Sequence, residues 1–156
     1  RVNSLSLPRF SYGARGPRFH YSDDAELQTH CVEVWSRSTE LLHQLCAANG
    51  VRFYEFLQPN QYLEGSKPMG DEERQLAYNP EHPYRQPVID CYPLLIREAA
   101  SLRQRGVRAH DLTQLFANQS EPTYVDDCCH FDEEGCLTLA RAIGAAIRED
   151  SVESGN

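Results

Sequence analysis

Residues 124–135 read Tyr124-Val125-Asp126-Asp127-Cys128-Cys129-His130-Phe131-Asp132-Glu133-Glu134-Gly135, and they lead into the last amphipathic run of the chain. In that run apolar residues recur every three or four positions, at Leu137, Ala140, Ile143, Gly144 and Ile147. This period predicts a helix from Asp132 to Arg148 with one buried face. Asp132 is placed to cap its N-terminus, and Glu133 and Glu134 suit the positive end of the helix dipole.

Asp127 and His130 stand three residues apart on the approach to this predicted helix. A carboxylate that accepts the Nδ1 proton of an imidazole fixes its tautomer and leaves Nε2 free to take a proton from a nucleophile. The pair could therefore do acid–base work. On spacing alone, the commoner interpretation of Asp-x-x-His on a polar loop is a solvated turn.

The composition is that of an ordinary globular protein. The chain has 156 residues, of which 40% are hydrophobic and 24% charged, which suits one domain or part of one. Its net charge of −8 argues against nucleic acid or an anionic membrane surface as a partner. No apolar run reaches the roughly 18 residues that a transmembrane span needs. Compartment and oligomeric state stay open.

The six cysteines show neither a CxxC pair nor a paired-spacing framework. Cys31, Cys46 and Cys91 are expected on the apolar faces of helices, where free cysteine behaves as a small hydrophobe. The remaining group could suggest a zinc-binding module, formed by Cys128, Cys129, His130 and Cys136. Adjacent cysteines do not easily face one tetrahedral site, and the usual gaps of about two to four residues are missing, so this is the weaker alternative.

The chain begins with an irregular segment, residues 1–22, which has prolines and glycines but no sustained period. A capping-box-like start at Asp23 then opens a helical pattern that runs to about Ala48 and should stop at Asn49-Gly50. Residues 51–57 follow at once, and their aromatic content predicts a strand. A helix, a glycine and a strand in this order are typical of a parallel sheet.

Gln58 and Asn60 flank the proline that closes this strand. Residues just past the carboxyl ends of parallel strands line the ligand crevice of open α/β sheets, so both are candidate substrate contacts, although a plain turn is an equal alternative. Residues 61–85 form a long polar connection, and we expect a functional cover or a mobile excursion. Its acidic run, Asp71-Glu72-Glu73, is expected to be solvated, within a helical turn.

A second helix is predicted from Arg85 to Gly106, with a kink or a delayed start at Pro93. Residues 107–112 predict another short strand. The chain is therefore α/β, with residues 23–149 as the domain and 150–156 as a disordered tail. Since two strands cannot make a stable sheet between three helices, we expect the C-terminal part of a larger domain.

The ending resembles the last block of the SGNH (GDSL-like) hydrolases, in which an Asp-x-x-His pair precedes the C-terminal helix and a glycine lies in its first turn. The residues that carry the resemblance are Asp127, His130, Gly135 and the following Leu137–Ile143 run. Residues 56–62 and 107–116 are similar to the strand ends that precede this block. The resemblance covers roughly residues 24–148.

The resemblance implies a flavodoxin-like three-layer α/β/α sandwich that hydrolyses a small-molecule or carbohydrate ester without a cofactor. In this family a serine attacks the carbonyl carbon, and here His130 would act as base and then acid while Asp127 orients it. The family spacing selects Asp127 over the neighbouring Asp126. Cys129 is not expected to be the nucleophile, because adjacent side chains diverge on an extended loop.

Two motifs of the family have no counterpart in this sequence, namely Gly-Asp-Ser with the nucleophile and Gly-x-Asn-Asp with the oxyanion-hole asparagine. We therefore expect this chain alone to be inactive. Because the chain starts at Arg1 and lacks the first strands, the leading hypothesis is a C-terminal fragment of an esterase whose missing blocks lie upstream. The alternative is a non-catalytic SGNH-like domain that binds a carbohydrate or protein partner.

Overall fold

The structure, a computed structural model, describes residues 19–153, with side chains through residue 150. The predicted leading segment, residues 1–22, therefore lies outside the described residues except for its last four. The elements are α2 (Asp24–Ala48), β1 (Tyr54–Leu57), α3 (Asp71–Ala77), α4 (Arg85–Gln104), β2 (Arg108–Asp111) and α5 (Glu133–Glu153). This order is mixed α/β, as the sequence predicts.

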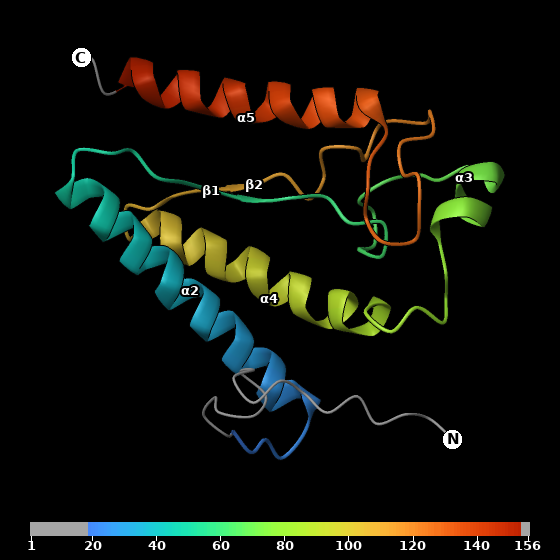
Figure 1. The fold of residues 1–156 in the computed structure, drawn as a ribbon, viewed down its shortest axis with the longest axis horizontal. Coiled ribbons are helices and arrows are strands. Elements are labelled where there is room, and N and C mark those ends of the chain that lie inside the picture. Colours follow the sequence, from blue (N-terminus) through green and yellow to red (C-terminus); the bar gives the residue numbers. More distant parts are fainter. Residues whose placement is uncertain (1–18, 154–156) are drawn as a thin grey trace, which may run out of the picture.

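The two strands form a parallel pair with helices on both sides. β1 and β2 are joined through α4, and their register pairs Tyr54 with Arg108 and Leu57 with Asp111. Figure 1 shows α5 on one side of the strands and α2 and α4 on the other. Within the described residues the sheet has only these two strands.

The two faces of the strands bury different residues. On the side of α4, Leu57 and Ala109 join Ala99, Leu102 and Val107 in a hydrophobic cluster. On the opposite side the rings of Phe56 and His110 stack with centroids 4.9 Å apart. The Arg108 guanidinium, on the same face, forms an ion pair of 2.6 Å with Asp150 of α5. The period-two alternation of each strand thus separates the two helical layers.

The ends of α2 follow from local signals. The Asp23 side chain accepts a hydrogen bond of 2.9 Å from the backbone N–H of Glu26, which confirms the predicted start. At the other end Gly50 adopts a φ of 69°, a left-handed conformation that glycine adopts without steric cost. The predicted stop at Asn49-Gly50 is confirmed.

Several predicted boundaries differ from the structure. Both strands begin later than expected. The Val51 N–H donates to the Cys46 carbonyl and the Val107 N–H to the Leu102 carbonyl, and each bond closes the preceding helix before the ladder begins. α4 continues through Pro93 without a delayed start. α5 continues to Glu153, past the position where the disordered tail was expected, since no glycine or proline lies between Asp150 and Glu153.

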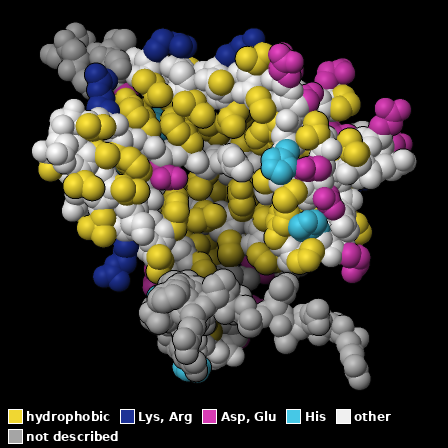
Figure 2. Space-filling model, viewed as in Figure 1, with side chains coloured by type: hydrophobic (Ala, Val, Ile, Leu, Met, Phe, Trp, Pro, Cys, Tyr) yellow, Lys and Arg dark blue, Asp and Glu magenta, His cyan; other side chains and the backbone are white. Residues whose placement is uncertain are grey.

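One face of α2 is apolar and is not covered by the other residues that the structure describes. Its exposed residues are spaced for a single stripe along the helix and are Leu27, Cys31, Val34, Leu41, Leu42 and Leu45. Cys31 lies on the apolar face of its helix as predicted, although this face is exposed, while Cys46 and Cys91 are half-buried. Figure 2 shows hydrophobic side chains gathered on the face of the molecule that lies between α5 and the α2–α4 pair.

Candidate active site

The segment before α5 is a tight turn stabilised by its own backbone. Tyr124 and Phe131 form an isolated antiparallel bridge, and the Val125 N–H donates to the His130 carbonyl at 3.0 Å. Between them Cys129 adopts a φ of 66°, which is uncommon for a residue other than glycine. We call residues 125–130 the His130 loop.

The His130 loop holds a carboxylate–imidazole pair. His130 Nδ1 lies 2.6 Å from Asp126 Oδ2, while Asp126 Oδ1 accepts the backbone N–H groups of Cys128 at 2.8 Å and His130 at 3.3 Å. Chiefly through the bond from the His130 ring, the pKa of the Asp126 carboxyl is held below its usual range. The His130 side chain is 67% exposed, so its Nε2 edge stays open.

The partner of His130 is therefore Asp126, not Asp127 as the family spacing predicts. Asp126 reaches the ring because its carboxylate also closes the turn on the loop's own N–H groups. Asp127 points elsewhere, and its Oδ2 accepts a hydrogen bond of 3.0 Å from Asn79 Nδ2. Whether either acid takes part in catalysis stays a prediction.

The start of α5 is arranged as the sequence predicts. Asp132 Oδ1 accepts the Gly135 N–H at 2.7 Å and so caps the helix. A Cβ added at Gly135 would lie 2.6 Å from Thr123 Cγ2, so a larger residue here would force Thr123 or the start of α5 to shift. The glycine therefore allows the chain on both sides of the His130 loop to pack closely.

A buried ion pair supports the same region from the long connection. Lys67 Nζ lies 2.9 Å from Glu73 Oε2, and both side chains are almost fully buried. Glu73 Oε1 also accepts the N–H groups of Thr123 and Tyr124, each at 2.8 Å. The expectation that Glu73 is solvated is wrong, because the carboxylate is used to anchor the chain that enters the His130 loop. Asp71 and Glu72 are exposed.

Gln58 and Asn60 have different surroundings. Gln58 is exposed, and its Nε2 lies 3.9 Å from Cys129 Sγ, so the structure brings this residue to the His130 loop. Asn60 is only 4% exposed. Its side-chain oxygen accepts the Tyr62 N–H at 3.0 Å and so closes the turn that begins the long connection. Substrate contact by either residue stays a prediction.

The described residues offer no partner for His130 Nε2. No serine or threonine hydroxyl among residues 19–150 is hydrogen-bonded to that ring. The neighbouring thiol of Cys129 is disfavoured as a nucleophile, because burial raises its pKa. Within the same part of the chain no group of at least three His, Cys, Asp or Glu side chains could hold a metal ion, so Cys128, Cys129, His130 and Cys136 form no such site.

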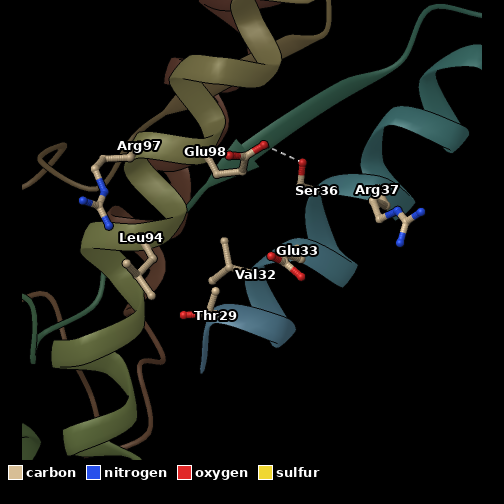
Figure 3. Close-up of a pocket in the computed structure, with 8 residues that line it drawn as sticks. All are labelled: Thr29, Val32, Glu33, Ser36, Arg37, Leu94, Arg97 and Glu98. Carbon is tan, nitrogen blue, oxygen red and sulfur yellow. Dashed lines mark hydrogen bonds between the residues drawn. The ribbon is translucent and has the colours of Figure 1, made fainter. Parts of the chain in front are cut away.

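Two cavities lie away from the exposed imidazole edge. One, of about 450 Å³, is lined by residues of the long connection and of α4, including Tyr62, Tyr78 and Arg85. The other, of about 630 Å³, lies between α2 and α4. Figure 3 shows the Ser36–Glu98 hydrogen bond of 2.6 Å crossing it. Neither cavity is lined by residues of the His130 loop.

Comparisons with known proteins found no matching family model, no matching curated sequence and no matching solved structure. None of the helices among residues 19–153 is long and apolar enough to cross a membrane.

Proposed function

We propose that this chain is the C-terminal part of an SGNH-type serine ester hydrolase, acting on an ester or O-acyl group of a small-molecule or carbohydrate substrate. The observation that carries the proposal is the 2.6 Å contact between His130 Nδ1 and Asp126 Oδ2, together with an exposed imidazole. This arrangement fixes the Nδ1–H tautomer and leaves Nε2 as a base. The resemblance of residues 124–143 to the last SGNH block supplies the reaction class.

In the proposed reaction the serine hydroxyl comes from outside this sequence. Its Oγ attacks the carbonyl carbon while its proton passes to His130 Nε2, and the imidazolium formed is stabilised by the carboxylate at Nδ1. His130 then gives this proton to the leaving alkoxide. A water molecule then attacks the acyl-serine in the same way, with His130 Nε2 taking its proton, and releases the carboxylic acid and the free serine. Asp126 is the acid that the geometry favours, and Asp127 is the one that the family spacing favours.

The arrangement of the elements supports a flavodoxin-like sandwich that is completed by further strands. A parallel pair joined through α4, with α5 on its other side, is a part of that architecture (Figure 1). Sheets of two strands are marginal by themselves. The uncovered apolar stripe of α2 and the hydrophobic face in Figure 2 would be buried if the sheet continued past one of its present edges.

A non-catalytic SGNH-like binding domain is the second candidate. It agrees, as does the first candidate, with the finding that no hydroxyl among residues 19–150 bonds to His130. Such a domain would bind its carbohydrate or protein partner without hydrolysis. The two candidates differ in whether a serine of the encoded protein reaches His130.

The test is hydrolysis of p-nitrophenyl acetate by the protein as it is encoded, including any sequence before Arg1, and by this chain alone. We expect turnover by the former, loss of turnover in its His130→Ala variant, and none by the chain alone. The matched control is His20→Ala, which removes an exposed histidine outside the His130 loop. A folded encoded protein that does not hydrolyse the ester would support the binding domain instead.

A further inference from the structure

Several side chains of the long connection donate hydrogen bonds to the backbone carbonyls of Asp126 and Asp127 in the His130 loop. The hydroxyls of Tyr62 and Tyr84 both donate to the Asp127 carbonyl, at 3.1 and 2.6 Å. The Gln61 amide donates to the Asp126 carbonyl at 3.2 Å, and the same nitrogen lies 3.2 Å from the Ala77 carbonyl. These donors are distant from the loop in sequence, so they restrain its position relative to the rest of the fold.

We propose that Gln61, Tyr62 and Tyr84 are positioning residues, which hold the peptide units of Asp126 and Asp127 so that Asp126 meets the His130 ring. The inference rests on the proposed function for its catalytic meaning, and on the contacts above for its geometry. The connection of residues 61–85 is then a support of the site rather than a mobile excursion.

The two tyrosines are suited to this task because their hydroxyls stay protonated. Burial is the main cause that raises the pKa of both Tyr62 and Tyr84 above the usual value. A protonated hydroxyl is a donor at every working pH, so both lone pairs of the Asp127 carbonyl stay occupied.

The tyrosines are themselves held by the connection. The Tyr62 hydroxyl accepts the Asn79 N–H at 3.2 Å, and the Tyr62 and Tyr84 rings meet edge to face with centroids 5.3 Å apart. The His82 ring packs against Tyr84 at 4.1 Å. Because each donor is fixed by packing, losing its hydrogen bond should release the loop rather than let another donor replace it.

The experiment measures the tautomer of the His130 ring by long-range ¹H–¹⁵N spectra of this chain, above the pH at which the ring is charged. The wild-type ring should carry its proton on Nδ1. We expect two variants to lose this preference for Nδ1. One is the double variant Tyr62→Phe/Tyr84→Phe, which keeps both rings, and the other is Gln61→Met, which keeps the side-chain length. Circular dichroism reports whether each variant folds, and either variant, if folded, tests the proposal.

The matched control is Tyr54→Phe, because the Tyr54 hydroxyl is buried without a hydrogen-bond partner and lies on the sheet. It should leave the Nδ1–H preference unchanged. A folded positioning variant that keeps the wild-type tautomer would overturn the proposal. A wild-type ring protonated on Nε2 would contradict the Asp126–His130 pair and with it the proposed function. The tautomer is measured without any ester, so this result is independent of the hydrolysis test.

Discussion

At the scale of single residues, Asp126 has two tasks, since one carboxylate oxygen closes the turn and the other meets the imidazole. A family pattern could not reveal this, because it counts positions and not directions. Asp-x-x-His selects Asp127, but the Asn79 amide turns that carboxylate away from His130. The helix cap at Asp132 was visible in the sequence, because it depends on a neighbour close along the chain, whereas the close approach of Thr123 to Gly135 was not.

The first prediction concerns the titration of Asp126. Its pKa is lowered in the folded state, mainly by the bond from His130, so the stabilisation from this bond is full above the unfolded value of about 3.9. It is lost as the pH falls through the lowered folded pKa. A carboxyl ¹³C titration should therefore show Asp126 below the usual range, and His130→Ala should raise its pKa. An unchanged midpoint in His130→Ala would contradict the pairing.

The second prediction concerns the two glycines of α5. Gly135→Ala should destabilise the chain by about 1–3 kcal/mol, because its Cβ would overlap Thr123 and Phe131. Gly144→Ala is the matched control in the same helix, since its Cβ would meet only the end of the Arg148 side chain at 3.5 Å. It should stabilise by about 0.5–1 kcal/mol. Urea unfolding measures both, and equal effects would contradict the close approach at Gly135.

At the scale of elements, the periodic helices α2, α4 and α5 were predictable because their period, caps and stop signals are local. The role of the long connection was not. Polar composition suggested solvation, yet Lys67 and Glu73 are buried as a pair, and Gln61, Tyr62 and Tyr84 reach Asp126 and Asp127. Such long-range pairings leave no period in a sequence, so only the folded structure reveals them.

The third prediction concerns the buried ion pair. Lys67→Met should destabilise the chain by about 3–5 kcal/mol, because Glu73 would remain buried without its cation. Arg141→Met is the matched control, since its ion pair with Glu134 is largely exposed and should contribute little. Urea unfolding measures the loss of unfolding free energy in each variant. Similar losses in both variants would show that burial of Lys67 does not matter.

At the scale of the whole molecule, the α/β class was predictable from the order of elements, whereas the number of strands in the complete sheet was not. The uncovered stripe of α2 leaves apolar surface in contact with water, and the described residues provide only two strands to cover the helices. The extent of a sheet depends on strands from segments distant in sequence. Under the proposed function, the further strands come from residues outside this sequence.

The fourth prediction tests this surface. The chain should bind the dye ANS while it unfolds cooperatively, and Leu41→Glu/Leu45→Glu should reduce the dye fluorescence, because both leucines lie in the stripe. Leu76→Glu is the matched control, since Leu76 is as exposed as Leu45, at 61%, but lies on α3. Equal fluorescence in all three proteins would argue against a continuous apolar face.

If the Asp126–His130 pair belongs to a serine hydrolase, the encoded protein should hydrolyse p-nitrophenyl acetate, and single variants of the pair should lose this turnover. We predict that His130→Ala abolishes turnover, that Asp126→Asn lowers kcat strongly, and that Asp127→Asn and His20→Ala leave most of it. Full turnover in folded His130→Ala, or no turnover in the folded wild-type protein, would contradict the claim.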